Sequence, residues 1–220
     1  MSTKKQYLVL GAGRFGTALA TTLYQMDHEV VVVDDREDVI EDIMHRVTHV
    51  MIADATDENI LRQLGAQNFD TVIVAIGQDL EANILATVAA KAIGAPYVIS
   101  KARNAVAAQV LSKVGADQVV QPEHDMGVRL AKQLHSPSVL EALDLGENYA
   151  VLEVQVTMRL AGPLGELKLP KRFGIQVITV DRNGDITVSP NAEFVLQKQD
   201  NILLLGTKKA VDRLQEYLAE

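Results

Sequence analysis

The sequence predicts an α/β protein in which a doubly wound parallel sheet is followed by a small α+β domain. Two observations carry this prediction. Short apolar runs alternate with amphipathic segments up to residue 122, and a glycine-rich turn directly follows the first run. Apolar residues make up 48% of the chain and aromatic residues only 4%, so the core must consist mainly of Val, Ile, Leu and Ala. Such a core is typical of a parallel sheet buried on both faces.

Strand and helix signals alternate regularly in the first part of the chain. Strands are expected at residues 7–10, 30–33, 50–53, 71–76, 97–100 and 118–120, and helices at 17–26, 39–45, 58–64, 80–93 and 105–114. Gly65, Gly94 and Gly115 each follow an expected helix, where glycine is common because it adopts the left-handed conformation without strain. These residues are therefore expected to form successive β-α-β units.

The pattern changes after residue 122. Residues 123–145 are expected to be mainly helical, with a break at Pro137. Beyond them, strands are expected at 150–156, 175–180, 186–189 and 202–205, and helices at 164–167 and 208–218. Asn183-Gly184 predicts a hairpin turn. The chain is thus expected to contain an α/β domain over residues 1–123, a helical connector over 124–145 and an α+β domain over 146–220.

The turn after the first strand contains Gly11, Gly13, Arg14, Phe15 and Gly16. In a Rossmann-like domain the first glycine permits the tight turn, the second lets the backbone approach a pyrophosphate, and the third lets helix and strand pack closely. The helix N-terminus adds free N–H groups and positive potential. The positive charge of Arg14 opposes the helix dipole, and its position is explained if the phosphates of a ligand supply the balancing negative charge. The alternative is a solvated surface arginine. The turn predicts a nucleotide site, against the alternative of a domain that has lost its ligand.

Acidic residues follow the second and third strands. Asp34 ends the second strand, where a carboxylate meets the hydroxyls of an adenosine ribose, and Asp35 follows it. ATP, ADP and NAD share this ribose, whereas the 2′-phosphate of NADP would be repelled. Asp54, next to Ala55, is expected either to accept a hydrogen bond from the adenine amino group or to cap the next helix, for which Thr56 and Asp57 are alternatives.

The ends of the fourth and fifth strands supply the remaining candidates. Ligands of doubly wound sheets lie in the crevice at the switch point, where the fourth strand lies beside the first. At the end of the fifth strand, two basic residues are expected either to reach phosphates or to form a solvated pair. These candidates are Ile76, Gly77, Gln78, Lys101, Ala102 and Arg103.

The formal net charge of −8, without a long basic run, argues against a nucleic-acid partner. There is no cysteine, so neither disulfides nor thiolate chemistry are expected. The first residues do not resemble a signal peptide, and no stretch approaches the roughly 18 uninterrupted apolar residues of a membrane span. We therefore expect a cytoplasmic protein.

No catalytic residue is evident. A dehydrogenase needs a general acid or base near the nicotinamide, and only His124 among the histidines lies near the expected crevice, without a catalytic partner pattern. No Walker lysine motif, HExxH or GxSxG sequence occurs. A nucleotide sensor is therefore expected rather than an enzyme. The alternatives are an NAD-dependent oxidoreductase and an NAD(H) redox sensor.

Several stretches also match one known family. They are residues 9–16, 28–34, 53–58, 74–77 and 122–127, and the run Pro122-Glu123-His124-Asp125-Met126-Gly127 discriminates best against generic dehydrogenases. Through them the whole chain resembles the RCK (KTN) family, specifically the cytosolic regulatory subunits of Ktr- and Trk-type potassium uptake systems.

The resemblance implies a regulatory subunit that forms homodimers, assembles into a homo-octameric ring and associates peripherally with the membrane through a potassium channel subunit. It implies binding of ATP or ADP, in some members NAD or NADH, and a ring whose shape changes with the ligand. Arg14 matches an arginine that meets the phosphates and Asp34 the ribose-binding aspartate. Glu123 matches a glutamate near which some members hold a divalent or monovalent cation between subunits. The last domain is similar to one that binds cyclic di-AMP in some members, although residues 170–173 depart from the expected pattern.

The helical connector is expected to carry dimer contacts, or alternatively to cover the sheet of its own chain. Its apolar residues are Met126, Val128, Leu130, Leu134, Val139, Leu140 and Leu143.

Overall fold

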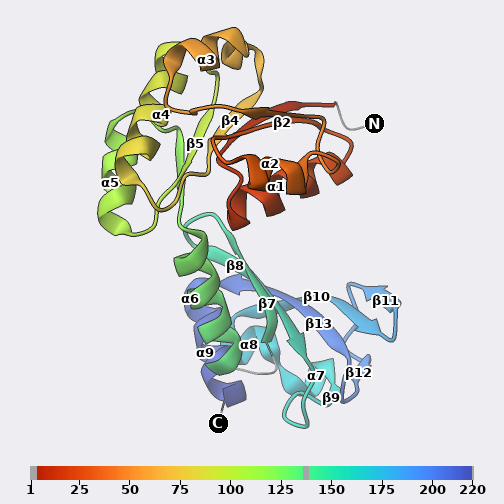
Figure 1. Cartoon of the computed structure of the whole chain (residues 1–220). Helices are drawn as coiled ribbons and strands as arrows, with labels where there is room; N and C mark the ends of the chain where they lie inside the picture. Colours follow the sequence, from red (N-terminus) through yellow and green to blue (C-terminus); the bar gives the residue numbers. More distant parts are fainter. Residues whose placement is uncertain (1–3, 136–138, 220) are drawn as a thin grey trace. The chain divides into compact units, whose positions relative to one another are not determined.

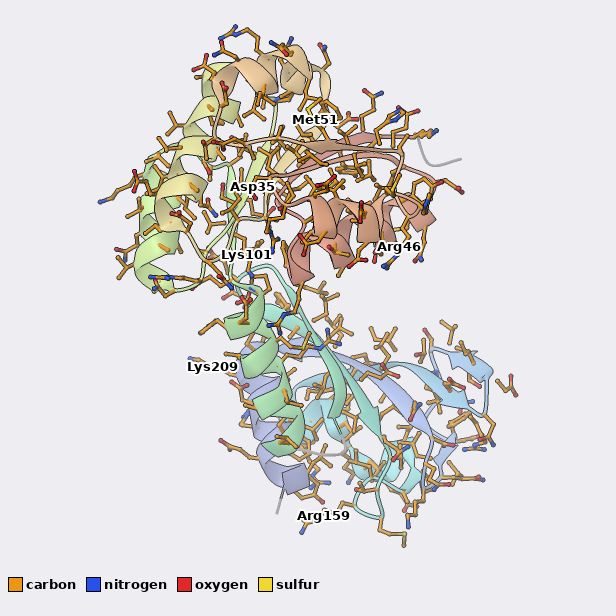
Figure 2. All side chains as sticks on the ribbon, in the orientation of Figure 1. Asp35, Arg46, Met51, Lys101, Arg159 and Lys209 are labelled. Carbon is orange, nitrogen blue, oxygen red and sulfur yellow. The ribbon has the colours of Figure 1, made fainter. Side chains whose placement is uncertain are left out.

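The computed structural model describes residues 4–135 and 139–219 and divides into two compact units, Met1–Met126 and Gly127–Glu220 (Figure 1). The first unit contains a six-stranded parallel sheet of order β3-β2-β1-β4-β5-β6. Its strands are β1 (Gln6–Leu10), β2 (Glu29–Asp34), β3 (His49–Ile52), β4 (Thr71–Val74), β5 (Val98–Lys101) and β6 (Gln118–Val120). This order confirms the predicted doubly wound sheet, with the switch point between β1 and β4.

Different helices cover the two faces of this sheet, because successive residues of a strand point to opposite faces. The helices are α1 (Arg14–Gln25), α2 (Glu37–Ile43), α3 (Glu58–Gln63), α4 (Leu80–Ala92) and α5 (Ala105–Lys113), with a 3-10 turn at Ala66–Asn68. Leu8 and Leu10 pack with residues of α3 and α4, whereas Val9 packs with residues of α1 and α2. In Figure 1, α1 and α2 accordingly lie on one side of the strands and α3 and α4 on the other.

The second unit has a five-stranded antiparallel sheet of order β11-β10-β13-β8-β7 and a two-stranded ladder of β12 and β9. Its strands are β7 (Val139–Leu145), β8 (Tyr149–Gln155), β9 (Gly162–Pro163), β10 (Ile175–Arg182), β11 (Asp185–Val188), β12 (Val195–Leu196) and β13 (Asn201–Thr207). Its helices are α7 (Leu164–Leu167), α8 (Leu169–Phe173) and α9 (Lys208–Ala219). The hairpin prediction is confirmed, since Asn183 and Gly184 both have positive φ between β10 and β11.

The expectation of helix over residues 139–145 is wrong, because these residues form β7. The strand pairs with β8 across a turn at Gly146, whose φ is +66°. Such pairing overrides local preference and cannot be read from a local pattern. The helical part of the connector is α6 (Pro122–His135), and the expected break at Pro137 lies outside the described residues. The short elements α8, β9 and β12 were not expected.

The apolar residues of α6 are solvent-facing. Met126, Val128 and Leu130 are exposed, and Leu134 is 73% exposed. These four therefore do not cover the sheet of their own chain. The side chains of Val139 and Leu140 lie outside the described residues. Within the described ranges, no helix combines the length and apolarity that a membrane span requires.

Candidate nucleotide-binding site

At two positions of the turn after β1, neighbouring backbone atoms leave room only for glycine. Gly11 has a φ of +100°, and a Cβ there would lie 3.2 Å from the backbone of Ala75 and Ile76. A Cβ on Gly16 would lie 2.0 Å from the carbonyl oxygen of Gly11. Only glycine fits at either position, as the motif predicts for the tight turn and the close helix–strand packing.

Gly13 differs, because the protein offers no steric reason for it. Its φ is −66°, and a Cβ there would meet nothing within 4 Å. The helix that follows has no side-chain cap and no acidic residue in its first turn. By contrast, Asp57, Asp79 and Asn104 cap α3, α4 and α5. The first N–H groups of α1 and the space above Gly13 therefore suit a phosphate.

A cavity of about 520 Å³ opens at this turn, within the usual range of small-molecule sites. The predicted residues that line it are Gly11, Gly13, Arg14, Asp34, Asp35, Asp54, Ala55, Ile76, Gly77 and Gln78. Six residues that were not predicted also line it, namely Val33, Arg36, Thr56, Ala75, Asp79 and Ala82. Their one available signal was position, since they lie in or beside the same strand-end loops. β4 ends at Val74, so Ile76 to Gln78 belong to the loop rather than to the strand.

Asp34 is 7% exposed and accepts hydrogen bonds on both carboxylate oxygens. Oδ2 accepts from the Ala12 amide at 2.7 Å and from Arg36 Nη2 at 3.3 Å. Oδ1 accepts from the Arg36 amide at 3.1 Å and from Arg36 Nε at 3.0 Å. Burial would raise the pKa of Asp34, but the hydrogen bonds from Arg36 and Ala12 outweigh it and hold the pKa below its usual range. The carboxylate is thus ionised and already engaged.

Asp54 lines the cavity without capping a helix. Its Oδ1 accepts from the amide of Thr56 at 2.8 Å and from the Thr56 hydroxyl at 2.7 Å. These bonds lower the pKa of Asp54. The cap of α3 is Asp57, which accepts from the Asn59 amide at 2.8 Å. The capping alternative for Asp54 is therefore wrong, and its contact with adenine remains a prediction.

Lys101 is neither a free phosphate ligand nor a solvated cation in this structure. Its Nζ lies 2.7 Å from Glu123 Oε1 and 5.7 Å from the centroid of the Phe15 ring. Arg103 donates to the carbonyl oxygen of Gln78 at 3.4 Å. These residues do not line the cavity, and neither do Gly16 and Ala102, which are buried. Their contact with phosphates therefore remains a prediction.

A buried polar network supports the site from below. Asn83 is 1% exposed, and its Nδ2 donates to the carbonyl oxygens of Ile76 and Lys101. Thr87, one turn further along α4, shares a hydrogen bond of 2.8 Å with Ser100. The network holds the loop after β4 against the end of β5. The sequence signal for it was a pair of polar residues spaced i, i+4 among the alanines of α4.

The predicted cation site at Glu123 is not formed by the described residues of one chain alone. Among the described residues, no group of three or more His, Cys, Asp or Glu side chains is placed to hold a metal ion. Glu123, the predicted cation ligand, is 69% exposed and is paired with Lys101, whose hydrogen bond lowers its pKa. His124, 67% exposed, lies 3.2 Å from Asp125 and does not line the cavity.

Three features define a Rossmann-class nucleotide-binding protein: the doubly wound sheet, the uncapped helix behind a glycine turn and the acidic residue at the end of β2. Matches to two domain families and to related proteins show which family within this class the chain belongs to. The TrkA-N domain family matches residues 7–122, and the TrkA-C domain family matches residues 162–219. Ktr system potassium uptake proteins A and C of Bacillus subtilis (strain 168) are each 37% identical to this chain, over 96% and 97% of both lengths. The chain therefore belongs to the RCK (KTN) family of regulatory subunits of Ktr- and Trk-type potassium uptake systems, as the resemblance implied.

Solved structures show the same fold. The structure described as the GsuK channel matches 99% of this chain with a TM-score of 0.71 and 25% identity. The crystal structure of the GsuK RCK domain matches the whole chain with a TM-score of 0.68 and 22% identity. This chain spans only 40% and 48% of those two chains.

Proposed function

We propose that this protein is the cytosolic, nucleotide-binding gating subunit of a potassium uptake channel and switches conformation with ATP against ADP. The observation that carries the proposal is the uncapped N-terminus of α1 behind the glycine turn at residues 11–16, which we call the phosphate cradle. Asp34 lines the same cavity, and the chain aligns almost end to end with Ktr proteins. Its partner would be a membrane potassium channel subunit. The exposed apolar residues of α6 suit the dimer contacts of a homodimer that assembles into an octameric ring.

The switch would be a population shift, in which a ligand moves the ring only by its differential affinity for two conformations. ATP carries one phosphate more than ADP. Arg14 begins α1, lines the cavity and is exposed, so it is a cation placed to respond to that added charge. A cation at Glu123 would need ligands from a second subunit, and no step of the proposal depends on it.

Binding is tested by calorimetric titration of the full chain with ATP, ADP, NAD and NADH, with light scattering on the same samples. We expect micromolar binding of ATP and ADP by an octamer, and its loss in Asp34→Ala. Cyclic di-AMP belongs in the series because the second unit is similar to a domain that binds it in some members of the family. Binding of NAD alone, by a dimer, would overturn the proposal in favour of the oxidoreductase or redox-sensor alternatives, which substrate-dependent NADH formation would then separate.

A further inference from the structure

The carboxylate of Asp34 has no acceptor position left for a ligand. An ionised carboxylate offers about four lone-pair positions on its two oxygens. Four protein donors occupy them, namely the amides of Ala12 and Arg36 and the Nε and Nη2 groups of Arg36. A ribose hydroxyl that is to bond Asp34 must therefore displace a donor that is already there.

The Arg36 side chain is the donor that can leave. The two amides belong to the backbone of the glycine turn and of the loop after β2, so moving them would disturb the fold. The Arg36 side chain is 55% exposed, and its bond to Oδ2, at 3.3 Å, is the longest of the four. Because it also lines the cavity, the guanidinium can swing away without crossing the core.

Building on the proposed nucleotide site, we propose that Arg36 is an internal competitor for the ribose hydroxyls. It fills the acceptor positions of Asp34 in the free protein and lowers the affinity for any nucleotide that carries these hydroxyls. Asp35 and Asp38 add to the attraction that holds the guanidinium in place. The same acidic surroundings disfavour the opposite role, in which Arg36 would bind a 2′-phosphate.

The test compares ATP with 2′,3′-dideoxy-ATP on the full chain and on Arg36→Ala. Removing the competitor should tighten ATP about two- to fivefold relative to the dideoxy nucleotide, the range expected for one partly exposed ion pair. The dideoxy compound lacks the hydroxyls that compete, so its affinity reports only the loss of positive charge. Arg36→Gln, which keeps a polar side chain, should give the same selective gain if the alanine variant folds poorly.

Arg62→Ala is the matched control, because Arg62 pairs with Glu58 on α3 and does not line the cavity. It should change neither affinity. The inference is overturned if Arg36→Ala weakens ATP more than dideoxy-ATP, or changes both equally. If the unsubstituted chain binds no adenine nucleotide, the proposed function fails as well, and that result is distinct from binding without a selective gain.

Discussion

The ammonium group of Lys101 lies 2.7 Å from Glu123 Oε1 and joins the end of β5 to the first turn of α6. The lysine side chain is 12% exposed and the glutamate side chain 69%, so water screens the carboxylate far more than the ammonium group. The contact therefore holds the side chain of Glu123, for which the family resemblance implies a role between subunits.

This pair makes the stability of the protein depend on pH. The hydrogen bond from Lys101 lowers the pKa of Glu123 below its ordinary value of 4.5. A lowered pKa gives stability that is present above that value and is lost as pH falls through the folded-state pKa. Glu123→Gln should thus lower the free energy of unfolding at pH 7 by about 0.5 kcal/mol, and the difference should shrink progressively as pH falls below 4.5.

Urea denaturation at pH 7 and at a series of pH values below 4.5 measures the effect. In a double-mutant cycle, Lys101→Met should cost less in the Glu123→Gln background than alone. Additive costs would show that the two side chains do not interact in solution.

Two glycines of the cradle should respond differently to the same added methyl group. Gly16→Ala places a Cβ against the backbone of Gly11 and should destabilise the protein by about 2 kcal/mol or more.

The Cβ of Gly13→Ala would lie in open space, so this substitution should change stability by less than about 0.5 kcal/mol. Its Cβ would instead occupy the space assigned to phosphate, so ATP affinity should fall at least about tenfold. Thermal unfolding and calorimetry separate these effects, and undiminished ATP binding by Gly13→Ala would place the phosphates elsewhere.

Asn83→Leu should destabilise the first unit by about 2–4 kcal/mol. The substitution keeps the number of side-chain heavy atoms but removes the amide that donates to the carbonyl oxygens of Ile76 and Lys101 in these partly buried hydrogen bonds. Replacing Thr87 by Val and Ser100 by Ala together removes both partners of one hydrogen bond and should cost much less. Equilibrium unfolding in urea compares the variants. A similar cost for both would mean that packing, rather than unsatisfied polar atoms, decides the outcome.

Arg14→Ala should leave stability unchanged or slightly raised, because a cation in the first turn opposes the helix dipole. ATP affinity should fall more than ADP affinity, since ATP brings the additional negative charge to this cavity. Arg46→Ala, which removes an exposed arginine away from the cavity, is the matched control. ATP and ADP affinities that the substitution leaves unchanged, together with an unaltered ring transition, would remove Arg14 from the switching mechanism.

Much of the fold could be predicted because its signals are local. The strands of the parallel sheet are apolar runs, and Gly11 and Gly16 mark the two positions of the turn at which only glycine fits. The position of Asp34 at the end of β2 follows from the same pattern. The connector was mispredicted beyond residue 138 because β7 exists only through its pairing with β8. No periodicity within residues 139–145 contains that information.

The sequence by itself determined the doubly wound class, the glycine turn and the acidic residue at the end of β2, since each depends on neighbours in the chain. The tertiary structure alone decided which polar groups meet across the strand ends. It brought the amide of Ala12 onto Asp34, Asn83 under the loop after β4, and Lys101 to Glu123. These contacts join the ends of different elements, and the direction of a side chain at a strand end is set by packing and hydrogen bonding in three dimensions.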